Sequence, residues 1–185
     1  LLASGEEERA LEAYDRFLGS VEGDREAREK TVVALTQKAR ALVALKREAE
    51  AKEALVEATS FSGDDHGAFL SLGVYLRLRG ENEDALEALE KASELMGQMQ
   101  PDFAVIRELG LTCLAMGRKS EAKEHLESVI KHSASQQQYD QFDPETAVML
   151  AKLHEEKKDY SSAADLYRHL AVGYDTANHF AYNLE

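Results

Sequence analysis

A small residue recurs along the chain at the same place in a repeated pattern of apolar residues. It is an alanine, at Ala10, Ala51, Ala85, Ala122 and Ala163, with successive spacings of 41, 34, 37 and 41 residues. Apolar residues follow these alanines at one and two helical turns, which is the periodicity of a buried helix face. Repetition at about 34 residues or more predicts an array of short helix–turn–helix units.

Two glycines lie inside predicted helices, at Gly73 and Gly110. A glycine in a helix interior costs about 1 kcal/mol relative to alanine, so another requirement must favour it. We expect each glycine to lie where the two helices of its unit cross closely, because a missing Cβ permits close packing. Ala85 and Ala122 are the expected small counterparts on the second helix.

Other glycines stand between the predicted helices of a unit. Gly80 and Gly117 lie five residues before a marker alanine, at a place where glycine readily ends a helix. Gly5 has the same spacing from Ala10, whereas Lys46 and Lys158 take this place in the remaining two units. We therefore expect one tight turn in the same position of every unit.

Hydrophobic periodicity and helix-capping residues predict ten helices. They are expected near residues 6–18, 25–45, 49–59, 65–79, 82–96, 101–117, 119–133, 144–157, 159–172 and from about 176 onward. Predicted N-caps are Asp24, Asp64 or Asp65, and Asp143, with Pro101 and Pro144 as first helical residues.

The repeated pattern resembles the tetratricopeptide repeat. Its best-matching units are the third and fourth, with Leu72-Gly73 and Leu109-Gly110, whereas the second and fifth are degenerate and the first keeps only its second helix. The resemblance covers nearly the whole chain. It implies an all-α, right-handed superhelical solenoid of about four and a half repeats, forming one domain over residues 1–185. Because the chain begins with Leu1, we expect it to be a piece of a longer protein.

The net charge of −13 argues against nucleic acid and anionic membranes as partners, since both are bound through Lys and Arg. No apolar run reaches the ~20 residues of a membrane span. The single cysteine, Cys113, excludes an internal disulfide and suits a reducing compartment. Its apolar neighbours indicate a small buried side chain. We expect a cytoplasmic or nuclear location.

Candidate catalytic and metal-binding patterns are weak. The stretch from His154 to Lys158 begins like a metalloprotease motif but lacks the second histidine. Asp165 and His169 lie one helical turn apart, but two ligands without a third more often form a solvated face. The sequence therefore predicts no catalytic residue, no metal site, no cofactor and no enzymatic activity.

The resemblance implies that the first helices of the units line a concave groove that binds a protein or peptide partner. The clamp with which many tetratricopeptide domains bind heat-shock chaperones is absent in both registers; the second to fourth units, for example, offer Ala104 and Glu108 where it needs cations. The projected groove is instead apolar with a row of arginines, Arg40, Arg77 and Arg107. The predicted groove residues are Arg40, Val43, Leu70, Val74, Arg77, Arg107, Leu111, Leu114 and Lys152.

The expected function is that of a scaffold or adaptor that binds a partner segment in this groove. The groove is alternatively filled by the chain's own longer sequence or by a further superhelical turn. Two different roles also stay open for the chain, a structural segment of a large multi-subunit assembly and a regulatory domain attached to an enzyme elsewhere in the full chain. Self-association is expected through apolar residues at the ends of the solenoid: Leu1, Leu2, Phe180, Tyr182 and Leu184.

Overall fold

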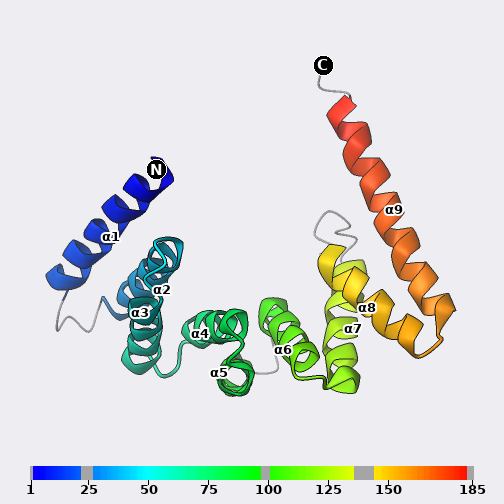
Figure 1. The fold of residues 1–185 in the computed structure, drawn as a ribbon, viewed down its shortest axis with the longest axis horizontal. Helices are drawn as coiled ribbons and strands as arrows, with labels where there is room; N and C mark the ends of the chain where they lie inside the picture. Colours follow the sequence, from blue (N-terminus) through cyan, green and yellow to red (C-terminus); the bar gives the residue numbers. More distant parts are fainter. Residues whose placement is uncertain (1, 22–26, 97–100, 136–143, 183–185) are drawn as a thin grey trace. The chain divides into compact units, whose positions relative to one another are not determined.

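The computed structural model describes a succession of helices (Figure 1). Its backbone is described over residues 2–21, 27–96, 101–135 and 144–182, and its side chains over the same ranges except 2–4, 133–135 and 172–182. The helices are α1 (Leu2–Ser20), α2 (Arg28–Ala44), α3 (Glu48–Phe61), α4 (His66–Arg79), α5 (Asn82–Met96), α6 (Phe103–Ala115), α7 (Lys119–Ser135), α8 (Pro144–Glu156) and α9 (Tyr160–Tyr182). All regular elements in these ranges are helices, which confirms the all-α helical-repeat prediction.

The chain forms two compact units. Unit 1 spans Leu1–Pro101 with α1 to α5, and unit 2 spans Asp102–Glu185 with α6 to α9. Within each unit every helix packs against the next one along the chain. The prediction that residues 1–185 form a single domain stays a prediction.

The same turn joins the two helices of four successive repeats. Its central residue has a left-handed backbone, with φ of 61° at Lys46, 80° at Gly80, 75° at Gly117 and 61° at Lys158. In each turn the N–H of this residue donates to the carbonyl three residues earlier, and the next N–H donates to the carbonyl four residues before the central residue. This pair of bonds is the Schellman ending of a helix. The predicted repeat register is therefore confirmed at all four turns.

The helix crossings explain the two internal glycines. A Cβ built on Gly73 would lie 2.6 Å from Leu89 Cγ and 3.3 Å from the Ala85 carbonyl oxygen. A Cβ on Gly110 would lie 2.7 Å from Leu126 Cδ2. Both approaches are shorter than van der Waals contact, so the second helix packs directly over the glycine backbone. The main neighbour is a leucine of the second helix, four residues after the predicted alanine.

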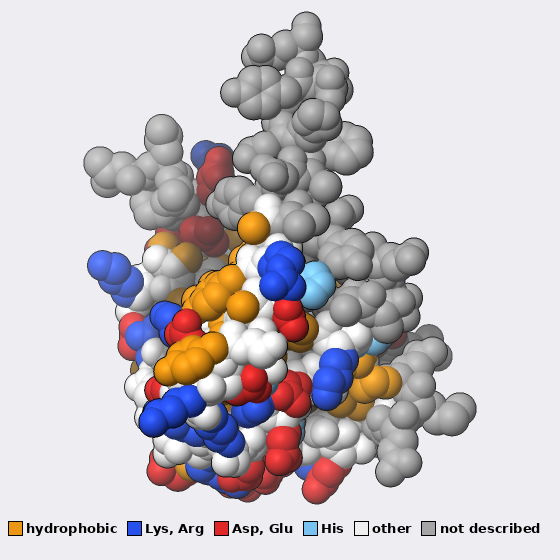
Figure 2. Space-filling view, turned by 90° about the vertical axis from the view of Figure 1, so that its right-hand side faces the viewer, with side chains coloured by type: hydrophobic (Ala, Val, Ile, Leu, Met, Phe, Trp, Pro, Cys, Tyr) orange, Lys and Arg blue, Asp and Glu red, His pale blue; other side chains and the backbone are white. Residues whose placement is uncertain are grey.

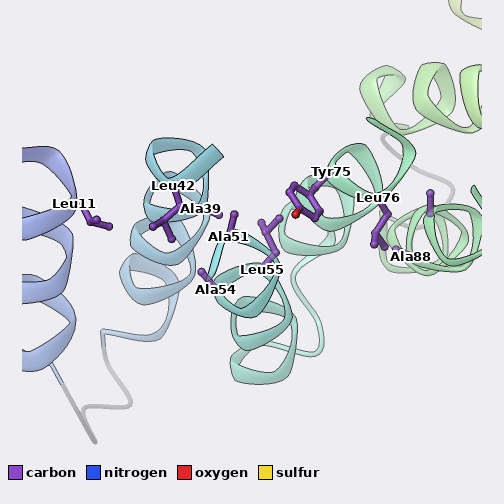
Figure 3. Close-up of a cluster of buried hydrophobic side chains, with 10 residues drawn as sticks. Leu11, Ala39, Leu42, Ala51, Ala54, Leu55, Tyr75, Leu76 and Ala88 are labelled. Carbon is purple, nitrogen blue, oxygen red and sulfur yellow. The ribbon is translucent and has the colours of Figure 1, made fainter. Parts of the chain in front are cut away.

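The core of unit 1 is built from small and medium side chains of all five helices (Figure 3). Leu42, Ala51 and Ala85 are fully buried in it, and Leu11 of α1 is 5% exposed. The phenol of Tyr75 lies in the same cluster and donates a 2.8 Å hydrogen bond to the Glu48 carbonyl. Because that bond links α4 to the start of α3, it satisfies a buried hydroxyl and ties neighbouring repeats together.

Unit 2 has a separate core around α6 to α9. Leu126 and Leu150 are at most 2% exposed, and Leu111, Ala163 and Leu166 pack with them. Cys113 is 1% exposed, as predicted. In the last repeat the buried residue is Leu166, whereas Tyr167, at the position predicted from the repeat, is 37% exposed.

Several predicted helix boundaries are wrong. No separate helix begins near residue 176, because α9 continues unbroken to Tyr182; Gly173 alone, without a capping residue or proline, does not stop it. The helix predicted from Pro101 begins at Phe103, with Asp102 as N-cap accepting from the Ala104 N–H at 2.9 Å. Gly5 lies inside α1 and not in a turn, because the chain before it is already helical.

The predicted N-caps have mixed outcomes. Asp65 caps α4 by accepting from the Ala68 N–H at 3.0 Å, and Pro144 is the first residue of α8, both as predicted. The cap position of α2 is Ala27, which makes no side-chain bond there. Both Asp24 and Asp143 lie outside the described residues.

Candidate functional site

A pocket of about 470 Å³ lies between the first helices α2 and α4 of unit 1. We call it the inner pocket. Ala39 of α2 and Leu55 of α3, which are 1% and 3% exposed, are its most buried lining residues. Its lining residues are Thr36, Ala39, Arg40, Val43, Leu55, Leu70, Ser71, Val74, Tyr75, Leu78 and Arg79.

The walls of the inner pocket are mainly apolar, because its hydroxyl groups are engaged by backbone carbonyls. Its three hydroxyl side chains all donate to backbone carbonyls at 2.8 Å: Thr36 to Val33, Ser71 to Gly67, and Tyr75 to Glu48. Leu78 stands at the rim and is 65% exposed. An exposed leucine beside an apolar hollow is typical of a surface that contacts another protein.

Two arginines line the inner pocket. Arg40 is exposed and its Nη1 donates to Gln37 Oε1 at 3.2 Å. Arg79 pairs with Glu48 and its guanidinium lies 5.6 Å from the centre of the Tyr75 ring. Because the salt bridge and the ring hold Arg79, Arg40 is the more adaptable of the two cations toward a carboxylate.

The structure brings together four of the predicted groove residues. Arg40, Val43, Leu70 and Val74 all line the inner pocket. Arg77 is half-buried on α4 and is not among its lining residues. Tyr75 and Arg79 line the pocket but were not among the predicted groove residues. They lie one helical turn apart, a spacing at which side chains of one helix meet.

Arg107 in unit 2 is engaged with three side chains. Its guanidinium donates to Glu108 at 2.7 Å, to the Thr146 hydroxyl at 3.1 Å and to Glu145 at 3.5 Å. Glu108 is 5% exposed and Thr146 is fully buried. Arg107 therefore ties α6 to α8 and neutralises a buried carboxylate, so its replacement would test folding more than binding.

The other predicted groove residues of unit 2 have different surroundings. Leu111 is only 8% exposed and belongs to the core of that unit, with Leu114 packed partly buried against the same cluster. Lys152 is exposed on α8. A contact between Leu111 and a partner would require the core to open, whereas Lys152 is accessible.

The histidines considered as metal ligands have other contacts. His154 is buried, with Nδ1 2.8 Å from Asp159 Oδ2 and Nε2 3.5 Å from Glu127 Oε1. The ring of His169 lies 2.8 Å from the Asp165 carbonyl. Among the described residues, no group of three or more His, Cys, Asp or Glu is placed to hold a metal ion.

Apolar patches on the surface lie among both acidic and basic side chains. On the face seen in Figure 2, hydrophobic side chains gather between acidic and basic ones. None of the helices in the described ranges is long and apolar enough to cross a membrane.

Comparison with known proteins supports the helical-repeat fold described above. A family model for the tetratricopeptide repeat matches residues 32–65, which cover most of α2, the Lys46 turn and α3. The chain has the tetratricopeptide-repeat fold. The predicted resemblance is thereby confirmed, and the matched repeat is the second one, predicted to be degenerate. This repeat is followed by the next marker alanine after 34 residues, from Ala51 to Ala85.

Solved structures with this fold align over nearly the whole chain. MamA aligns with a TM-score of 0.73 and 18% identity, over 95% of this chain and 92% of MamA. The tetratricopeptide-like repeats of a Podosopora anserina chain assigned as a kinesin light chain align with a TM-score of 0.74 and 17% identity, over 95% and 90%. A chain of the APC/C hetero-tetramer Cut9–Hcn1 aligns with a TM-score of 0.68 and 16% identity, over 93% of this chain and 30% of that one. No curated protein matches the sequence.

Proposed function

We propose that this chain is a protein-interaction scaffold that binds a partner segment in the inner pocket of unit 1. The observation that carries the proposal is the apolar hollow of about 470 Å³ with the exposed Arg40 and Leu78 at its rim. Apolar hollows with a few cations are typical of grooves that bind peptides and helices.

The pocket favours a partner that combines apolar and acidic side chains. Val43, Leu70 and Val74 would contact the apolar ones, and burial of that surface supplies most of the affinity. A carboxylate of the partner would pair with Arg40, whose planar guanidinium can donate two parallel hydrogen bonds to it. That pair would set the orientation and the association rate more than the affinity.

The remaining predicted groove residues differ in whether a partner can reach them. Arg77 and Lys152 are accessible and could extend contacts with a partner beyond the inner pocket. The contacts of Arg107 favour a structural role for it, and burial favours the same for Leu111. The scaffold proposal includes no catalytic step, and both the absence of catalysis and an intracellular location stay predictions.

A display selection against the immobilised chain tests the proposal. Peptides selected from a random phage-displayed library should include a class that combines apolar residues with Asp or Glu. Binding of this class should weaken by about tenfold or more with Leu78→Glu and with Arg40→Glu, as for loss of a central contact. Arg16→Glu is the matched control, because Arg16 is an exposed arginine of α1 that pairs with Glu12.

Two outcomes would contradict the proposal. One is a set of selected peptides that bind the Leu78→Glu and Arg40→Glu variants as tightly as the unchanged chain. The other is equal weakening by Arg40→Glu and Arg16→Glu, which would mean that net charge and not the inner pocket governs binding. Circular dichroism of each variant verifies that its helices are retained.

A further inference from the structure

Unit 1 has a second hollow, which the proposed function does not use. It measures about 600 Å³ and lies between the second helices α3 and α5, with α4 beneath. We call it the outer groove. Its lining residues are Lys52, Val56, Phe69, Leu72, Leu76, Asp84, Glu87, Ala88, Lys91 and Glu94.

The two hollows use opposite sides of α4. The inner pocket takes Leu70, Ser71, Val74, Tyr75, Leu78 and Arg79, and the outer groove takes residues 69, 72 and 76 of the same helix. Each residue of an α-helix advances by about 100°, so the centres of the two sets lie about 140° apart around the helix. A ligand in one hollow therefore does not occupy the other.

The floor of the outer groove is apolar and partly open. Phe69 and Leu72 are half-buried, and Val56 on α3 is 45% exposed. Ala88 of α5, which is 7% exposed, also lines the groove. The floor thus offers a strip that the apolar side of an amphipathic helix could cover.

The rim of the outer groove is acidic. Asp84 and Glu87 are exposed along its α5 edge. Its two lysines are already held by carboxylates, Lys52 by Glu81 at 2.5 Å and Lys91 by Glu94 at 2.9 Å. The helices α3 and α5 carry four and five carboxylates respectively, against one lysine each.

We propose that the outer groove binds an amphipathic helix of a partner protein that carries Lys or Arg beside its apolar stripe. The apolar stripe would cover Val56, Phe69 and Leu72. The cations would meet Asp84 and Glu87 at the rim, where the field of the surrounding carboxylates favours positive charge. Unit 1 would then have two faces of different preference, acidic partners at the inner pocket and basic partners at the outer groove.

Two synthetic helical peptides of equal length test this proposal. Both have the same leucine stripe, and their polar positions are all lysine in one and all glutamate in the other. Binding is measured by fluorescence anisotropy of the labelled peptides at two salt concentrations. The lysine peptide should bind saturably and more tightly than the glutamate peptide. Its affinity should fall about tenfold or more in the double variant Asp84→Lys, Glu87→Lys, and also in Val56→Asp.

A matched double variant separates the groove from bulk charge. Glu83→Lys, Glu90→Lys changes the net charge equally, on the same helix, at exposed residues that do not line the groove. It should bind the lysine peptide within about twofold of the unchanged chain, with a somewhat smaller salt dependence, because less negative charge remains to be screened. Leu78→Glu should also leave this binding unchanged, because Leu78 belongs to the inner pocket.

Three results would overturn the proposal. They are no saturable binding of the lysine peptide, no preference for it over the glutamate peptide, and equal loss in the two double variants. A loss with Leu78→Glu alone would place the lysine peptide in the inner pocket, which also contradicts the outer groove. Retained thermal unfolding midpoints show that a loss of binding reflects the groove and not the fold.

Discussion

Gly73 shows how one residue sets the spacing of two helices. Its Cα lies so close to α5 that an added Cβ would come within 2.8 Å of two atoms of the Leu89 side chain. Leu89 is fully buried, so it has little room to move away. The helix-propensity cost of glycine is thus offset by close packing of α4 on α5.

Gly73→Ala should destabilise the chain by about 1–3 kcal/mol, because overpacking outweighs the gain in helix propensity. The free energy of unfolding in urea measures the effect. Gly19→Ala is the control, since a Cβ on this helical glycine of α1 would meet nothing within 4 Å. Stability of Gly73→Ala equal to or above that of the unchanged chain would show that the crossing is looser than described.

Lys46 and Lys158 carry a strain that the glycines at the same place avoid. Both have φ of 61°, which brings the Cβ of an ordinary residue close to its own carbonyl oxygen. Lys46→Gly and Lys158→Gly should each raise the free energy of unfolding by about 0.5–1 kcal/mol. The gain is limited because glycine also increases the entropy of the unfolded chain.

The matched control for these turns is a lysine in an ordinary helix. Lys30→Gly in the exposed face of α2 should lower stability by up to about 1 kcal/mol. Chemical denaturation of the three variants distinguishes the two environments. If all three glycine variants lose stability alike, the left-handed turns carry no strain.

At the scale of elements, the start of α9 depends on a single carboxylate. Asp159 lies directly before Tyr160 and accepts from the Ser162 N–H at 3.3 Å, as an N-cap does. It also contacts His154 of α8 at 2.8 Å. Hydrogen bonds from Ser162, and then from His154, lower the pKa of Asp159 to about 2 from its ordinary value of 3.8.

A depressed pKa predicts a definite dependence of stability on pH. The ionised Asp159 stabilises the folded state above about pH 4, and this contribution disappears as the pH falls through about 2. Asp159→Ala should therefore be less stable than the unchanged chain at pH 5, with the difference shrinking toward pH 2. Urea unfolding across this range measures it, with Glu155→Ala, an exposed carboxylate of α8, as control. A difference that stays constant down to pH 2 would contradict the assignment.

Some charged residues that are spaced to form an ion pair within one helix instead pair with a residue of another helix or turn. Glu48 and Lys52 are spaced for a pair on α3, but Glu48 contacts Arg79 and Lys52 contacts Glu81. Lys38, at a usually apolar repeat position, pairs with Asp15 of α1 at 2.7 Å. The long side chains reach a neighbouring helix because the helices of unit 1 pack directly on one another.

At the scale of the whole molecule, each unit has its own core, and repeat arrays expose apolar surface wherever the stacking of helices ends. We expect self-association at high concentration, driven by apolar residues near both ends of the chain, such as Leu2 and Phe180, whose side chains lie outside those described. Sedimentation over a range of concentrations should show a rising average mass. Phe180→Lys should reduce the rise, and a constant monomer mass would contradict the prediction.

The sequence by itself determined the helices, the repeat register and the close crossings. These depend on local signals, since periodicity marks a helix face and a small residue marks a crossing within one repeat. Gly73, Gly80 and Cys113 therefore have the surroundings that the sequence predicts. Lys38 stands in the second repeat where later repeats have Leu72, Leu109 and Leu150, and its pair with Asp15 of α1 explains why lysine is tolerated there.

Only the tertiary structure decided which side chains of the first helices are available to a partner. Leu70 and Leu111 were both predicted to line the groove, yet Leu70 borders the inner pocket while Leu111 packs in a core. Arg40 and Arg107 differ likewise, because the second is held by Glu108 and Glu145. Such differences depend on side chains supplied by neighbouring helices, including residues far along the chain, and periodicity within one helix does not encode them.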